Sequence, residues 1–201
     1  MEYQLVPGAP AEDTASRPDT APIRLLGRGT SSRIVDRDGT VVRDGRSGAS
    51  IYGLELNPSQ NMALIYFGDA EYAIASVGTP DDASALPTIP PGLEDATGFT
   101  WHWLDDAHLL GEAHLPPADV AGRTASEIDA LPPAAVLLYV YSVEDRHLAS
   151  VETSDDLPRL FQIHATSGWN LTLLTLGEDA ERSLGATIER TPRPAPPLPH
   201  H

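Results

Sequence analysis

The sequence predicts an all-β fold built from antiparallel meander sheets. Short apolar or alternating runs recur along the 201 residues, clusters of Gly, Asn, Asp and Pro separate them, and runs with helical periodicity are scarce. Alternation with a period of two places every second side chain on one face of a strand, whereas an amphipathic helix needs a period near 3.6. A two-sheet β-sandwich is the alternative arrangement for the same strands.

Turn signals divide the first half of the chain into six expected strands. The tripeptide Arg37-Asp38-Gly39 predicts a hairpin, because Asp and Gly tolerate the positive φ angles that tight turns need. The segment from Asn57 to Asn61 predicts a second turn, and the Pro-rich stretch Thr79–Leu93 predicts a surface loop. The expected strands are Ile23–Leu26, Arg33–Asp36, Thr40–Arg43, Ser50–Leu56, Met62–Phe67 and Tyr72–Val77.

The second half continues the same pattern. Acidic pairs at Asp105-Asp106 and Glu144-Asp145 predict two further turns. Between them lies the Pro-rich stretch Pro116–Pro133, which predicts a long surface loop with one short helix at Ala125–Leu131. The expected strands are Phe99–Leu104, His108–His114, Val136–Ser142, His147–Glu152, Leu160–Ala165 and Asn170–Leu176.

Composition divides the chain into three parts. We expect a flexible N-terminal segment at residues 1–22, one all-β domain at residues 23–190, and an extended Pro-rich C-terminal tail at residues 191–201. The N-terminal residues lack the basic and apolar regions of a signal peptide. Since no apolar run approaches the roughly 20 residues that span a bilayer, we expect a cytoplasmic protein without a membrane partner.

One segment recurs within the chain. Ala75–Asp82 and Ala149–Asp156 share the pattern Ala-Ser-Val-x-Thr-x-Asp-Asp. Upstream of each lies a similar apolar run, Leu64–Phe67 and Leu137–Val140, followed by a polar turn. The shared context of strand, turn and strand indicates an internal repeat, which is typical of stacked or radially arranged sheets.

Three segments resemble the blades of TolB-like and WD40-like β-propellers. Leu54–Phe67, Phe99–Glu112 and Val136–Glu152 each read as an apolar strand, a polar or acidic turn and a second apolar strand. The sequence departs from the family because it has no Trp-Asp dipeptide and offers about three blade-like units, whereas a closed propeller needs at least about four. The resemblance implies a small or incomplete propeller that serves as a scaffold for recognition.

Composition excludes several classes of protein. The chain has no Cys and no Lys, which excludes disulfide scaffolds, Cys-ligated metal centres, Cys nucleophiles and Schiff-base enzymes. The net charge is −16, and residues 51–158 carry all of it, with eighteen acidic residues against two Arg. Phosphate is repelled by such a surface, so we expect no nucleic-acid partner. A confined acidic field would instead steer association with a basic protein.

These observations predict a non-enzymatic acidic recognition module that binds a basic protein partner. One concrete form is an immunity or inhibitor-type protein that covers the active site of a cationic toxin or nuclease. Nucleophile-elbow and phosphate-loop motifs are absent from the sequence, and it predicts no catalytic residue and no cofactor. The candidate partner-binding residues are the paired acids Asp81, Asp82, Asp105, Asp106, Glu144, Asp145, Asp155 and Asp156.

Two enzyme-like or ligand-binding alternatives remain open. A metal-dependent hydrolase could use His102, His108 and His114 as ligands. A two-residue or four-residue turn at Asp105-Asp106 would place His102 on the opposite face from the other two histidines, and only an odd-length turn would bring all three to one face. We expect this polar cluster to lie on a solvated face of the sheet, opposite the aromatic side chains of Phe99, Trp101 and Trp103.

The second alternative is a carbohydrate-binding protein. Trp101 and Trp103 share one strand face with Phe99, and a Trp pair can form a stacking platform for a sugar ring. We expect these three side chains to lie in the core instead, because each buries a large apolar area there.

Overall fold

The computed structural model describes residues 2–12, 21–27, 29–45, 50–68, 71–86, 98–117, 124, 133–176 and 182–191. The regular structure in this part of the chain is almost entirely β-strand, which confirms the all-β fold and its antiparallel sheets. No helix in the described ranges is long and apolar enough to cross a membrane. The strands are β1 (Glu2–Pro7), β2 (Ile23–Leu26), β3 (Arg33–Asp36), β4 (Val41–Asp44), β5 (Gly53–Leu56), β6 (Met62–Gly68), β7 (Glu71–Ser76), β8 (Thr79–Ala85), β9 (Gly98–Trp103), β10 (His108–Leu115), β11 (Ala135–Ser142), β12 (His147–Thr153), β13 (Phe161–Ser167), β14 (Asn170–Thr175) and β15 (Ser183–Thr191).

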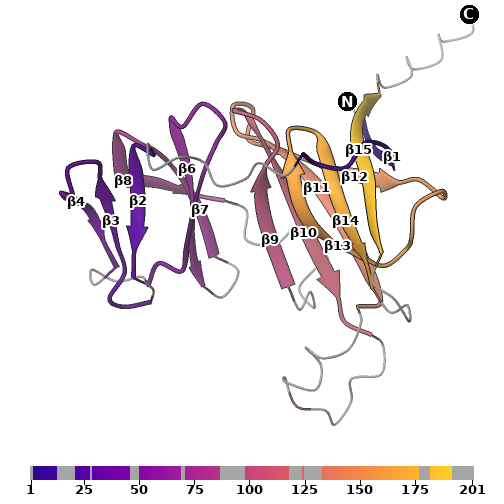
Figure 1. Ribbon diagram of the computed structural model, residues 1–201, viewed down its shortest axis with the longest axis horizontal. Coiled ribbons are helices and arrows are strands. Elements are labelled where there is room, and N and C mark those ends of the chain that lie inside the picture. The colour runs from indigo at the N-terminus through magenta and orange to yellow at the C-terminus, as the bar shows by residue number, and fades with distance from the viewer. Residues whose placement is uncertain are drawn as a thin grey trace, which may run out of the picture.

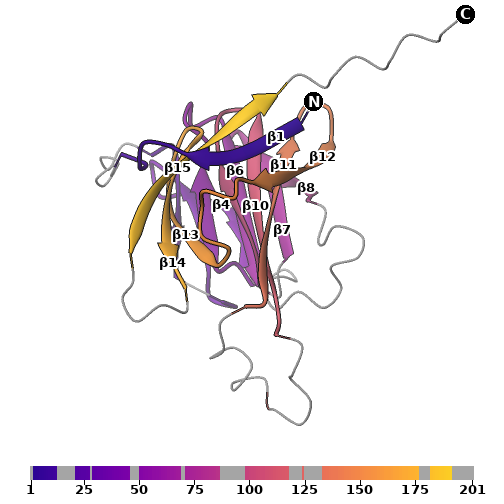
Figure 2. The same ribbon diagram turned by 90° about the vertical axis from the view of Figure 1, so that its right-hand side faces the viewer.

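The largest sheet has eight strands in the order β13-β14-β15-β1-β12-β11-β10-β9. Neighbouring strands are antiparallel except β1 and β12, which are parallel. The sheet curls into a nearly closed barrel: β13 and β14 lie on one side, β10 to β12 on the other, and β15 and β1 cross between them (Figure 2). Its interior is filled by one apolar cluster that includes Leu5, Leu110, Phe161 and Leu171, each at most 1% exposed.

The first strand corrects the expected flexible segment at residues 1–22. Residues 2–7 form β1, which pairs with β12 on one side and with β15 on the other. Tyr3 and Leu5 point into the barrel interior and are 8% and 0% exposed. The apolar patch at this end of the chain is therefore one face of a strand, and its burial between two neighbours explains why it is ordered. Residues 13–20 lie outside the described part.

The two smaller sheets form the other half of the molecule (Figure 1). Their strand orders are β2-β3-β4 and β5-β6-β7-β8, and both are antiparallel meanders. They share an apolar cluster centred on Ile34, Ile51 and Ile65, all fully buried. The predicted hairpin between β3 and β4 is confirmed, since Gly39 has a φ of 84° and the Asp36 carboxylate accepts the Thr40 N–H at 2.8 Å.

Aromatic side chains join the two halves. Phe99, Trp101 and Trp103 lie on the outer face of the barrel, pack with Leu64 and Ile74 of the four-stranded sheet, and are 4%, 2% and 4% exposed. The core interpretation of these residues is confirmed. A sugar cannot stack on Trp101 or Trp103, because their rings are covered on this face.

Two further strands appear where no strand was expected. β8 occupies the first part of the predicted loop Thr79–Leu93, and β15 extends through residues 183–191, into the first residue of the expected tail. The two repeat segments also differ: Val77 lies in the turn between β7 and β8, whereas Val151 lies within β12. The helix expected at Ala125–Leu131 and the tail after residue 191 lie outside the described residues.

The resemblance to propeller blades stays a prediction. The sheet β5-β6-β7-β8 has the four antiparallel strands of one blade in meander order. The eight-stranded sheet, by contrast, is continuous around one interior and contains a parallel pair.

Candidate functional site

The β9–β10 turn determines where the histidines point. Trp103 pairs with Leu109 and His102 pairs with Leu110, so five residues lie between the last paired residues of the hairpin. An odd-length turn places His102 on the same face as His108 and the other even-numbered residues of β10. The expected two-residue turn is therefore wrong.

This shared face points into the barrel rather than into solvent. Leu110 and Glu112 lie on it and are 0% and 4% exposed. The prediction of a solvated face opposite the aromatic residues is therefore wrong as well, because the sheet curls and encloses that face.

The three histidines do not converge on one point. Each pairs with a different carboxylate: His102 Nδ1 with Glu55 Oε2 at 3.7 Å, His108 Nδ1 with Asp105 Oδ1 at 2.8 Å, and His114 Nε2 with Glu112 Oε1 at 2.9 Å. Across the described residues, no group of three or more His, Asp or Glu side chains could hold a metal ion. The acids near these histidines thus serve as individual partners, Asp105 and Glu112 by hydrogen bonds and Glu55 by a longer ion pair.

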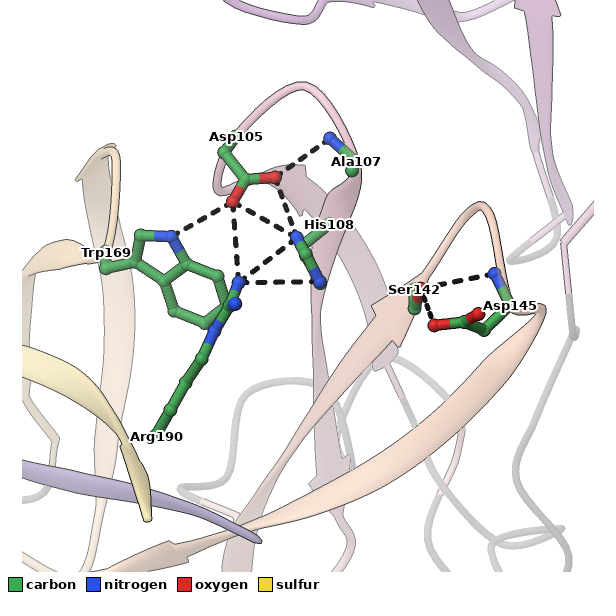
Figure 3. Close-up of polar contacts among 7 residues, drawn as sticks. All are labelled: Asp105, Ala107, His108, Ser142, Asp145, Trp169 and Arg190. Atoms are coloured by element: carbon green, nitrogen blue, oxygen red, sulfur yellow. Dashed lines mark hydrogen bonds and ion pairs between the residues drawn. The ribbon is translucent and has the colours of Figure 1, made fainter. Parts of the chain in front are cut away.

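Asp105 is the centre of a polar cluster at one end of the barrel (Figure 3). Its Oδ1 accepts the backbone N–H of Ala107 at 2.8 Å, and its Oδ2 accepts the indole N–H of Trp169 at 3.1 Å. His108 Nδ1 lies 2.8 Å from Oδ1 and 3.1 Å from Oδ2. Because an ionised carboxylate can only accept, Nδ1 carries the proton and donates it to Asp105.

These contacts keep Asp105 ionised. Partial burial by itself raises the pKa of a carboxyl group, because it disfavours the charged form. The hydrogen bonds from Ala107, His108 and Trp169 outweigh that effect and hold the pKa of Asp105 below its usual value of 3.8.

Arg190 of β15 completes the cluster. Its guanidinium carbon lies 4.3 Å from the centre of the Trp169 ring, in cation–π geometry. Its Nη2 lies 3.4 Å from Nε2 of His108 and 3.7 Å from Oδ2 of Asp105. Tyr3 also stacks on Trp169, with ring centres 5.9 Å apart and an angle of 7° between the planes. Residues from five separate strands or turns therefore meet here.

A cavity of about 220 Å³ opens beside Arg190. Its apolar wall consists of Tyr3, Val140 and Ala149, and its polar rim consists of His108, Ser142, Asp145, His147 and Arg190. The Ser142 hydroxyl donates to the Asp145 carboxylate at 3.1 Å and accepts the Asp145 N–H at 3.3 Å. This cavity combines an apolar wall with hydrogen-bonding groups and with charged groups of both signs.

The structure brings four of the eight candidate acids together. Asp105 and Asp106 lie in the β9–β10 turn, Glu144 and Asp145 lie in the β11–β12 turn, and a hydrogen bond from Val143 N–H to the Ala107 carbonyl at 2.9 Å joins the two turns. We call these four residues the tip acids. Asp106, Glu144 and Asp145 are exposed, whereas Asp105 is half-buried.

The other four candidates lie elsewhere. Asp155 and Asp156 are exposed at the opposite end of β12, and Asp82 is exposed on β8 of the four-stranded sheet. Asp81 also lies in β8, but its side chain is outside the described part. The paired acids therefore do not form one continuous surface.

Sequence reasoning missed three members of the cluster. Tyr3 and Arg190 lie in or next to the expected terminal segments, and Trp169 lies 64 residues from Asp105 in the sequence. The alternation of Leu184, Ala186 and Ile188 in β15 was a usable signal for a strand that ends at this site.

A larger cleft of about 910 Å³ lies between the two halves of the molecule. Its walls come largely from β2, β5, β9 and the end of β13, and each of these four is a terminal strand of its sheet. Apolar residues such as Leu25, Leu54 and Trp103 alternate there with Arg24 and Glu55.

A scan against protein-family models finds no matching family, and a search of curated proteins finds no matching sequence.

Proposed function

We propose that the protein is a non-enzymatic recognition module whose tip acids bind a basic protein partner. The observation that carries this proposal is the convergence of two acidic turns, distant in sequence, at one end of the barrel. An inhibitor that covers a cationic active site, such as an immunity protein, is the form of this function that fits best. Such a protein would act by charge-steered docking.

The acids that face a partner are fewer than the net charge suggests. Glu55, Asp105 and Glu112 are each paired with a histidine inside the structure. Asp106, Glu144 and Asp145 are exposed and therefore available to a partner. Charges at the rim of an interface mainly raise the association rate.

The turns that carry these acids are held in place before binding. Asp106 Oδ1 accepts the Ser59 N–H at 2.8 Å, which ties the β9–β10 turn to the β5–β6 turn. Ser142 and Asp145 fix the β11–β12 turn by two mutual hydrogen bonds. A surface that is already ordered loses less conformational entropy on binding.

A matched pair of charge-reversal variants tests the proposal. The first variant carries Asp106→Arg, Glu144→Arg and Asp145→Arg, and the second carries Asp82→Arg, Asp155→Arg and Asp156→Arg, so both change the net charge equally. The probe is a synthetic nona-arginine peptide, and its association rate is measured between about 20 and about 300 mM salt.

We expect the tip variant to lose about tenfold or more in association rate at low salt, while the second variant stays within about twofold of the unmodified protein. An equal loss in both variants would show that only net charge matters and that the tip is no site. An association rate that is indifferent to salt would remove the electrostatic basis of the proposal.

A further inference from the structure

We propose that Trp169, His108 and Asp105 form a cage for a guanidinium group, which Arg190 occupies in the free protein and which an arginine of the partner occupies in the complex. This inference rests on the proposed function, because it names the side chain by which a basic partner is anchored. The cage lies next to the exposed tip acids and at the rim of the cavity of about 220 Å³.

The chemistry of the cage matches a guanidinium group. An indole face attracts a planar cation, and a carboxylate beside it accepts the N–H groups of the same cation. Trp169 and Asp105 are held in this relative position by their own hydrogen bond of 3.1 Å, and His108 is oriented by its bond of 2.8 Å to Asp105. The cage is therefore rigid, and its members are already oriented without help from Arg190.

Arg190 shows that a guanidinium group fits, but it is held weakly. Its carbon lies 4.3 Å from the Trp169 ring centre. Its closest ion-pair distance to Asp105 is 3.7 Å, well beyond the roughly 2.7–2.9 Å of a strong charge-assisted hydrogen bond. The side chain is also 42% exposed, and exposed ion pairs contribute little free energy.

The cavity beside Arg190 can receive its side chain when another guanidinium group displaces it. The cavity is lined by Tyr3, Val140 and Ala149, which can cover the aliphatic part of a displaced side chain. At the rim of the same cavity, Asp145 offers a second carboxylate to the displaced guanidinium. The exchange of one arginine for another therefore requires a change of side-chain rotamer and no movement of a strand.

Removal of Arg190 should open the cage to a small probe. We compare N-acetyl-arginine amide with N-acetyl-citrulline amide, which has the same shape without the charge. Binding is followed by the NMR signal of the Trp169 indole N–H, which Trp169→Phe identifies among the three tryptophans of the chain.

If Arg190 leaves the cage free about a tenth of the time, Arg190→Ala should bind the arginine probe about tenfold more tightly than the unmodified protein. The citrulline probe should bind neither protein, and the double variant Arg190→Ala/Asp105→Asn should lose the gain. Arg190→Gln keeps part of the aliphatic stem and serves as the second open-cage variant, if Arg190→Ala fails to fold.

Equal binding of the arginine probe to the unmodified and open-cage proteins would overturn the inference, as would equal binding of arginine and citrulline. These outcomes are distinct from failure of the proposed function. Both charge-reversal variants retain Trp169, His108, Asp105 and Arg190. If the cage binds the arginine probe while the two charge-reversal variants associate equally fast with the peptide, the cage is supported and the proposal of an acidic binding tip is overturned.

Discussion

At the scale of single residues, the buried carboxylate of Glu112 closes the barrel. Glu112 is 4% exposed and its Oε1 accepts the backbone N–H of Ile163 in β13 at 3.1 Å, across the gap between the two ends of the sheet. The same oxygen lies 2.9 Å from Nε2 of His114. A side chain therefore supplies the hydrogen bond that a neighbouring strand would supply in a fully closed barrel.

Replacement of Glu112 by Ala should lower the free energy of unfolding by roughly 2–4 kcal/mol, because it leaves the Ile163 N–H without its partner in a buried site. Glu112→Gln should cost less, since its amide oxygen can still accept that hydrogen bond. Urea denaturation measures both, with Glu152→Ala on the exposed face of β12 as the control. If Glu112→Ala and Glu152→Ala were equally stable, Glu112 would have no closing role.

His102 should make the stability depend on pH. Burial alone lowers the pKa of a histidine, but the hydrogen bond and charge of Glu55 and the charge of Glu112 outweigh it, so the pKa of His102 is raised above 6.5. A raised pKa in the folded state means that the protonated form is stabilised. This contribution is complete below the unfolded value and is lost as the pH rises through the folded value.

We therefore expect His102→Gln to destabilise the protein more at about pH 5.5 than at about pH 8.5. The difference in unfolding free energy between the variant and the unmodified protein, measured in urea at both values, gives the result directly. If this difference in unfolding free energy stayed constant or grew as the pH rises, the raised pKa of His102 would be contradicted.

At the scale of secondary-structure elements, local periodicity was sufficient for strands with a clear apolar face. β2 and β3 begin and end at the predicted residues, because alternation and the Asp-Gly turn are local signals. β8 was missed because its sequence, Thr-Pro-Asp-Asp-Ala-Ser-Ala, carries no such alternation and its pairing with β7 stabilises it. The register between β9 and β10 was not predicted either. It depends on the length of the turn, which is shaped by the hydrogen bond from the Ala107 N–H to the Asp105 carboxylate, and the sequence does not reveal that contact.

β1 should be essential to the barrel. Leu5 is fully buried in the barrel cluster, whereas Gln4 points to the opposite face. Leu5→Ala should lower the free energy of unfolding by about 2–5 kcal/mol, and Gln4→Ala should stay within about 1 kcal/mol of the unmodified protein. Chemical denaturation of both variants tests this prediction. An unchanged stability of Leu5→Ala would mean that β1 does not stabilise the barrel, as expected of a flexible segment.

At the scale of the whole molecule, the sequence predicted the acidic and histidine side chains of the site but not the other residues that join them. Asp105, His108 and Asp145 were identified because acidic turns and nearby histidines are visible in one stretch of chain. Trp169 and Arg190 join them only because the sheet curls until β14 and β15 approach the β9–β10 turn. Closure of a sheet depends on twist and long-range pairing, which no window of sequence contains.

The position of β1 determines the order in which the molecule can assemble. The strands β2 to β8 pair with their neighbours in sequence, so their sheets can form while later residues are still being synthesised. Tyr3 pairs with Val151 and Arg190, so β1 can reach its place only after β12 and β15 have been made. Contacts this distant in sequence slow folding. Of the strands that the structure describes, the one that comes earliest in the sequence is therefore among the last to reach its native neighbours.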